Sequence, residues 1–186
     1  MGILIFIFLL QKIKLSIASV NGVSKGFAMT GWRVGFIGAP LWIAKACNKI
    51  QGQITSATCA IAQKAAETAM LADPKEVTNE MKATFLKRRN MILNELNSIK
   101  GIKCNVPQGA FYVFPDVSYY FSKSVGDTII NNANDFCMYL LNKAHVAFVS
   151  GDAFGNPECV RISYAESDDK LMEAMSRVKQ QLAKLS

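Results

Sequence analysis

The chain has 186 residues, a mass of 20.4 kDa and a formal net charge of +7, with 51% hydrophobic and 19% charged residues. This composition argues against a mainly disordered chain, and no apolar run reaches the ~20 residues that span a bilayer. The five cysteines are scattered without a CxxC pair, and His145 is the only histidine. These counts argue against a zinc site and a disulfide scaffold and favour a reducing, cytoplasmic setting.

The excess positive charge lies in the first third of the chain. Residues 1–66 hold seven of the 21 basic residues and no Asp or Glu, whereas residues 67–186 hold 14 basic and 14 acidic residues. The seven cations are spread singly, whereas a DNA-binding surface clusters them on one face. We therefore expect no nucleic-acid partner. We interpret this segment as one that contacts acidic groups elsewhere in a larger protein.

The chain begins with an apolar run over residues 3–10. Lys12 and Lys14 follow the run instead of preceding it, which argues against a signal peptide, and Phe6 stands where myristoylation needs Ser or Thr. Two interpretations stay open: a strand buried on both faces of a parallel sheet, or an arbitrary start caused by a shifted reading frame. Neither involves a membrane.

Three helices are predicted in the middle of the chain. The first covers 40–54 and starts at Pro40; the second covers 57–72 and stops at Asp73-Pro74. A longer helix runs from about residue 77 and ends near Gly101.

After residue 101 the hydrophobic period changes to that of strands. Strands are predicted over 102–106, 110–114, 145–149 and 159–164, with a loop over 150–157. In the last strand, Val160, Ile162 and Tyr164 face one side, and Arg161 and Ser163 the other. Two helices complete this part: one capped by Asn134, and one capped by Ser167 with a core stripe of Leu171, Met175, Val178 and Leu182. Residues 77–186 thus form an α+β unit with its own core.

Residues 21–38 read NGVSKGFAMTGWRVGFIG and contain the chemistry-bearing pair Lys25 and Arg33. Five glycines imply tight turns or close approach of the backbone to a ligand. Arg33 can hold a phosphate through its two-pronged guanidinium. Lys25 has apolar neighbours, and desolvation there would make its amine nucleophilic. An amine beside a phosphate clamp suits an aldehyde-bearing phosphate cofactor, although spacing alone favours a glycine-rich hairpin with two surface cations.

The motifs Gly22–Lys25 and Gly31–Gly35 closely resemble the cofactor-lysine segment of class I aminotransferases, the aspartate aminotransferase family of fold-type I pyridoxal-phosphate enzymes. The pattern NGVSKxxAMTGWRxG is typical of the bacterial aspartate aminotransferase branch. The resemblance continues through QGQITSATCAIAQKAA, QGAFYVF, GDAFG and VRISYA, and covers roughly residues 19–186. Residues 1–18 do not resemble the corresponding stretch of the family.

The resemblance implies a fold and a domain arrangement. The fold class is α/β, the C-terminal portion of a fold-type I transferase. Residues 1–76 would be a remnant of the large domain that binds the cofactor, with the lysine loop and two helices. Residues 77–186 would be the small C-terminal α+β domain. In the intact family the enzyme is expected to be a cytoplasmic homodimer.

The resemblance also implies roles for individual residues. Lys25 would form the Schiff base with pyridoxal 5′-phosphate and would move the proton between the substrate Cα and the cofactor. Arg33 would bind the cofactor phosphate, with Ser24 assisting, although Gly22 stands where the family often has a hydroxyl. Arg161 would hold the substrate α-carboxylate in a bidentate pair. Phe111 and Tyr112 would line the substrate site or, as we favour, pack in the core.

The resemblance is restricted to the latter part of the family, and this limits the expected activity. The family's aspartate for the pyridine nitrogen has no counterpart, because residues 1–66 contain no Asp or Glu. Helices 40–54 and 57–72 would expose apolar faces that should pack on a sheet. We therefore expect a truncated aminotransferase with weak or no activity.

Several readings of the function stay open at this stage. The first is amino-group transfer between an L-amino acid, with aspartate expected, and a 2-oxo acid. Another class I enzyme, such as an aromatic or alanine transaminase, is an alternative, as is a lyase on the same fold. A different class of function is a non-catalytic chain that acts only through association with another chain.

Overall fold

The computed structural model describes residues 17–186, so the apolar run at 3–10 and its predicted strand lie outside the described residues. The chain divides into two compact units, Met1–Glu80 and Met81–Ser186. Their junction falls inside a helix, four residues after the boundary predicted between residues 76 and 77. Each unit is described by itself below.

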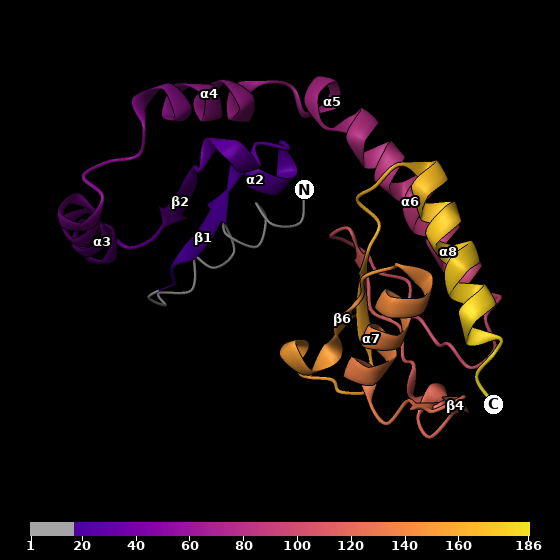
Figure 1. Cartoon of the computed structure of the whole chain (residues 1–186). Helices are drawn as coiled ribbons and strands as arrows, with labels where there is room; N and C mark the ends of the chain where they lie inside the picture. Colours follow the sequence, from indigo (N-terminus) through magenta and orange to yellow (C-terminus); the bar gives the residue numbers. More distant parts are fainter. Residues whose placement is uncertain (1–16) are drawn as a thin grey trace. The chain divides into compact units, whose positions relative to one another are not determined.

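The first unit is built on a two-stranded antiparallel hairpin (Figure 1). Strand β1 (Ser19–Gly22) pairs with β2 (Gly35–Gly38), and Gly22 lies opposite Gly35 at the closed end. A Cβ atom on Gly22 would lie only 3.0 Å from the carbonyl oxygen of Val34, so the close approach of the two strands favours glycine there. The short helix α2 (Val23–Gly26) and the 3₁₀ turn η1 (Thr30–Trp32) form the connection.

Helices α3 (Leu41–Ile54) and α4 (Ala60–Leu71) follow the hairpin and agree with the helices predicted over 40–54 and 57–72. Helix α3 buries none of its residues, and α4 buries only Ala62 and Ala66. Ile43 is half-buried, but seven other large apolar side chains of these helices are between 51% and 79% exposed: Leu41, Trp42, Ile50, Ile54, Ile61, Met70 and Leu71. The prediction that these two helices leave their apolar faces uncovered is therefore confirmed.

The second unit has a hydrophobic core shared by three helices and a sheet. The long helix predicted from about residue 77 to near Gly101 corresponds to α6 (Asn79–Asn97), and the short helix α5 (Pro74–Val77) precedes it in the first unit. Helices α7 (Ala133–Ala144) and α8 (Asp168–Leu182) complete the set, and the α8 stripe Leu171, Met175, Val178 and Leu182 is buried as predicted. No helix within residues 17–186 is long and apolar enough to cross a membrane.

Helices α6 and α8 lie side by side, joined by ion pairs near both ends of α8 (Figure 1). Asp168 in the first turn of α8 accepts from Lys87 Nζ at 2.5 Å and from Arg88 Nε at 2.8 Å. These two cations hold the pKa of the Asp168 carboxyl below its usual value. Near the other end, Lys179 pairs with Glu95.

The main sheet has three antiparallel strands in the order β3 (Tyr112–Val113), β7 (Val160–Ser163), β6 (Val149–Ser150). A separate hairpin joins β4 (Ser124–Val125) to β5 (Thr128–Ile129). The alternation predicted for the last strand is confirmed, because Val160 and Ile162 are buried while Ser163 is exposed.

Other predicted boundaries are wrong for local reasons. The segment 102–106 forms no strand, because its pairing is limited to one bridge between Lys103 and Asp116. The strand predicted over 145–149 is only Val149–Ser150, since His145 adopts a left-handed conformation (φ 55°) that ends α7. Helix α7 is capped by Asn132 rather than Asn134, and the Asn132 Oδ1 accepts from the Asp135 N–H at 2.9 Å. The predicted loop 150–157 contains the 3₁₀ turn η3 (Gly151–Phe154).

The α7 helix allows a matched test of the second core. Leu140 is completely buried, whereas its neighbour Leu141 is 43% exposed. We expect Leu140→Ala to lower the free energy of unfolding by about 2–5 kcal/mol, because it leaves a cavity, and Leu141→Ala to lower it much less. Chemical denaturation followed by circular dichroism measures both. Equal losses for the two variants would contradict the described core.

Candidate functional site

The hairpin brings the predicted cofactor residues onto one connection. Because β1 and β2 are paired up to Gly22 and Gly35, residues 23–34 connect the neighbouring ends of the two strands. Lys25 and Ser24 lie on α2, and Arg33 directly follows η1. The hydrogen bond from the Val23 N–H to the Val34 carbonyl, 3.4 Å, closes the base of this connection. The amine and the guanidinium are thus carried by the same short connection.

Arg33 is held in an unusual backbone conformation. Its φ of 55° and ψ of 45° are left-handed, a region that non-glycine residues rarely adopt. Its Nη1 donates to the carbonyl oxygen of Thr30 at 2.8 Å. Such conformations cost roughly 1–3 kcal/mol and cluster at ligand sites. The left-handed backbone and the Thr30 contact therefore fix the direction in which this exposed side chain leaves the connection.

The surroundings of Lys25 differ from the sequence expectation. Lys25 is exposed, and Ser24 is half-buried. The expected partial desolvation of the Lys25 amine is therefore wrong for this chain, because its apolar neighbours do not cover it. Exposure leaves the amine accessible to a small molecule from solvent.

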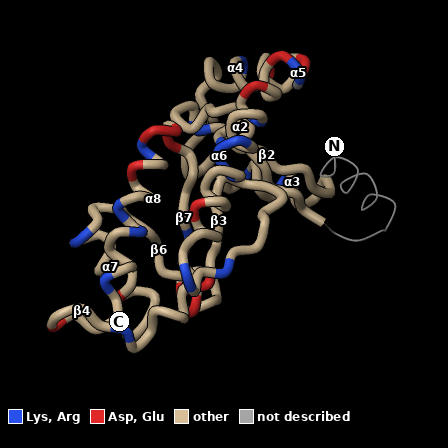
Figure 2. Tube along the Cα trace, turned by 90° about the vertical axis from the view of Figure 1, so that its right-hand side faces the viewer, with Lys and Arg blue, Asp and Glu red and all other residues tan. Residues whose placement is uncertain are grey.

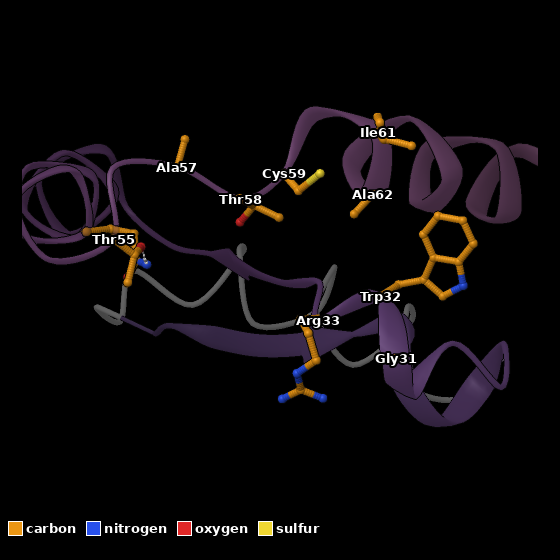
Figure 3. Close-up of a pocket in the computed structure, with 10 residues that line it drawn as sticks. Gly31, Trp32, Arg33, Thr55, Ala57, Thr58, Cys59, Ile61 and Ala62 are labelled. Atoms are coloured by element: carbon orange, nitrogen blue, oxygen red, sulfur yellow. Dashed lines mark hydrogen bonds between the residues drawn. The ribbon is translucent and has the colours of Figure 1, made fainter.

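A cavity of about 700 Å³ lies beside the connection and is lined by residues 31–33 together with the segment joining α3 to α4. Thr58 and Cys59 belong to this lining, and Lys25 is not one of its residues. Figure 3 shows the Arg33 guanidinium pointing away from Thr58 and Cys59. The charged end of Arg33 is thus directed to the side of the hairpin opposite this cavity.

Residues 17–66, which include Lys25 and Arg33, contain no carboxylate, and Glu67 of α4 lines a cavity together with Val34 and Gly35. Helices α2 and α3 carry lysines, coloured blue in Figure 2, but no acidic residue, and the first acidic residue in the sequence is Glu67. Glu67 lies on α4, where it pairs with Lys64 at 2.7 Å. Within residues 17–66 there is accordingly no group to hold a protonated ring nitrogen.

Arg161, the predicted carboxylate-binding residue, lies in the second unit on β7, opposite Val149 of β6. It is half-buried, and its guanidinium carbon lies 4.5 Å from the ring centroid of Tyr112 and 4.4 Å from that of Phe154. Sequence reasoning assigned Tyr112 to the core or the substrate site and gave Phe154 no role. The signal for Phe154 was the GDAFG motif, but sequence spacing does not show that η3 turns toward β7.

Cys59 is a further chemical group that sequence reasoning did not identify. It precedes α4, and its thiol is exposed. The backbone N–H groups of Ala62 and Ile61, at the start of α4, lower the pKa of the Cys59 thiol. By contrast, burial, assisted by the charge of Asp152, raises the pKa of Cys137 to about 11.

These opposite shifts predict an order of thiol reactivity. A lowered pKa increases the thiolate fraction at neutral pH, so iodoacetamide is expected to alkylate Cys59 early and Cys137 last. Peptide mapping by mass spectrometry after brief exposure measures the order. Cys47→Ser, which removes another exposed thiol, is the control and should leave the Cys59 rate unchanged. Alkylation of Cys137 as fast as Cys59 would be inconsistent with the described burial.

Comparison with known proteins decides the family. The sequence model of the family described as aminotransferase class I and II matches residues 5–178 of this chain. The chain belongs to this family. The match begins upstream of residue 19, so the expectation that residues 1–18 do not resemble the family is wrong from residue 5 onward.

The relatives also confirm the fold class. The crystal structure of aspartate aminotransferase from Rhizobium meliloti is 43% identical with a TM-score of 0.86, and the match covers 91% of this chain and 42% of that one. An aromatic aminotransferase from Pyrococcus horikoshii is 37% identical with a TM-score of 0.78, covering 89% of this chain and 43% of that one. The fold is α/β, the C-terminal portion of a fold-type I transferase.

Curated relatives extend the same finding to plants. Aspartate aminotransferase from Pinus pinaster is 44% identical over 167 residues, which is 88% of this chain and 34% of that protein. A bifunctional aspartate aminotransferase and glutamate/aspartate-prephenate aminotransferase from Petunia hybrida is 47% identical, covering 88% and 35%. The chain spans about a third of the length of these plant relatives. Class I aminotransferases depend on pyridoxal 5′-phosphate.

Proposed function

We propose that this chain carries the cofactor-lysine connection and the small domain of a pyridoxal-phosphate-dependent aminotransferase, with weak or no activity by itself. The proposed reaction transfers an amino group between an L-amino acid, aspartate in the first instance, and a 2-oxo acid. The observation that carries the proposal is the common position of Lys25 and Arg33 on one closed connection, in a chain of the aminotransferase family. The similarity to enzymes named for aspartate supports the choice of amino acid.

The donor set fits two ends of pyridoxal 5′-phosphate. Lys25 supplies an exposed amine for the aldehyde, and Arg33, with Ser24 beside Lys25, supplies donors for the phosphate. The ring nitrogen has no partner among residues 17–66, because these contain no carboxylate. When bound, the cofactor supplies a sink for the electron pair of the substrate Cα–H bond. A ring nitrogen without a carboxylate weakens that sink, so low activity is part of the proposal.

The chain's own residues would divide the remaining work. Lys25 would take the proton from the substrate Cα and return it, as general base and then acid. Arg161 would orient the substrate by holding its α-carboxylate through two parallel hydrogen bonds. We further propose a cytoplasmic location, supported by five free thiols, and a homodimer as the intact assembly, by analogy with the family.

Covalent trapping tests the cofactor role of Lys25. Purified protein is incubated with pyridoxal 5′-phosphate and reduced with borohydride, and peptide mapping locates the attached group. We expect attachment mainly at Lys25 and its loss in Lys25→Ala. Lys49→Ala, which removes an exposed lysine of α3, is the matched control and should leave labelling at Lys25 unchanged.

One result of this experiment and one result of a separate activity assay would contradict the proposal. Equal labelling of Lys25 and Lys49 would show that exposure alone decides the reaction. Efficient transamination of aspartate with 2-oxoglutarate by the chain alone would contradict the expected low activity, although it would support the assigned reaction.

A second candidate function is a non-catalytic chain that acts by association with another chain. The specific observation that favours it is the exposed apolar surface of α3 and α4, in a segment that carries cations but no carboxylate up to residue 66. Exposed patches of this kind mark interaction surfaces in soluble proteins. Such a surface fits a partner whose own apolar face is bordered by acidic residues.

The oligomeric state tests this candidate. We expect size-exclusion chromatography with light scattering to show association that is lost when Ile50 and Ile54 of α3 are both replaced by Ser, because burial of these side chains drives it. Ile129→Ser, which changes an exposed residue of β5, serves as the control. A wild-type chain that stays monomeric over a wide concentration range would count against association.

A further inference from the structure

The guanidinium of Arg161 is held by aromatic rings that come from two other elements. Tyr112 belongs to β3, the neighbouring strand of β7, and Phe154 ends η3. The Arg161 Cζ lies over both rings, 4.5 Å and 4.4 Å from their centroids. Both distances are inside the range in which a ring quadrupole attracts a cation. Two such contacts on one side chain restrict the plane of the guanidinium.

Further rings and a close backbone contact support these two rings. Tyr112 is packed against Phe111 with centroids 4.5 Å apart, and Phe154 meets Phe114 edge-on at 6.2 Å. A Cβ on Gly151 would lie 2.1 Å from the Asn156 carbonyl oxygen and 2.4 Å from that of Cys159. Glycine at 151 therefore allows η3 to approach the residue just before β7, which brings Phe154 to Arg161.

Core packing does not account for this arrangement. Phe154 is 46% exposed and Tyr112 is half-buried, so neither ring is part of the buried cluster of the second unit. Within residues 17–186, the Arg161 guanidinium donates no hydrogen bond and forms no ion pair. Its position is therefore set by the rings rather than by a carboxylate.

An arginine held by aromatic rings differs from an arginine held by a carboxylate in its capacity to bind a ligand. An acidic partner would occupy the N–H edge of the guanidinium and neutralise its charge. Aromatic rings contact the faces of the planar group and leave its charge and its N–H edges available. An arginine held in this way is prepared to receive the carboxylate of a ligand.

We propose that Tyr112 and Phe154 are positioning residues that orient Arg161 for a ligand carboxylate. The proposal rests on the proposed function of Arg161 and adds the two rings to it. The hydroxyl of Tyr112 is not required, since the ring face makes the contact. Aromatic replacements should therefore preserve the effect, and aliphatic replacements should abolish it.

Side-chain NMR of the whole chain tests the proposal without cofactor. The ¹⁵N–¹H signal of Arg161 Nε, assigned through Arg161→Lys, reports order through its heteronuclear NOE. We expect Arg161 to be ordered in wild type, Tyr112→Phe and Phe154→Tyr, and mobile in Tyr112→Leu and Phe154→Leu. Tyr119→Leu, which removes another exposed ring, is the control. Backbone signals of Val160 and Ile162 identify any variant with an altered fold.

Titration with succinate, a small dicarboxylate, measures the functional consequence. Loss of either ring is expected to weaken succinate binding about fivefold, whereas the aromatic replacements bind as wild type does. An Arg161 that is equally ordered in the leucine variants, or aromatic variants that behave like the leucine ones, would overturn the proposal. Absence of any succinate effect on wild-type Arg161 would instead refute its carboxylate-binding role, while the NOE comparison would still decide the positioning.

Discussion

The antiparallel pairing of β1 with β2 is the constraint on which the site depends. With Gly22 opposite Gly35, the chain must leave one strand and return to its neighbour within residues 23–34. A buried Val23 anchors the start of this connection. Lys25 and Arg33 thereby lie on one short connection between two paired strands. The family resemblance assigns chemistry to the two residues, and the hairpin explains how they are held together.

The two units differ in how well their apolar surface is covered. The second unit buries residues from α6, α7, α8 and the three-stranded sheet in one cluster, and the ion pairs of Asp168 and Glu95 join α8 to α6. In the first unit, α3 and α4 keep the pattern of amphipathic helices but bury almost none of it. The same segment has cations without carboxylates up to residue 66. Both features describe a surface suited to contact with another apolar and acidic surface.

The sequence predicted secondary structure well where burial of one face imposes a periodic pattern. It predicted secondary structure poorly where a strand depends on a pairing partner elsewhere in the chain. The stripe of α8 and the alternation around Arg161 were predictable because burial enforces their period. The segment 102–106 alternates equally well but finds only one bridging residue, and alternation does not reveal a partner. For the site, Lys25 and Arg33 were identified by motif. The rings around Arg161 were not, because they depend on how β3 and η3 approach β7 in space.

The central claim is that Lys25 and Arg33 act on opposite ends of one ligand. The most direct measurement compares borohydride trapping at Lys25 by pyridoxal 5′-phosphate and by pyridoxal, which lacks the phosphate, in wild type and in Arg33→Gln. If the claim is correct, Arg33→Gln lowers labelling by the phosphorylated compound and leaves labelling by pyridoxal unchanged. An equal effect on both compounds, or no effect on either, would show that Arg33 does not bind the phosphate of a molecule attached to Lys25.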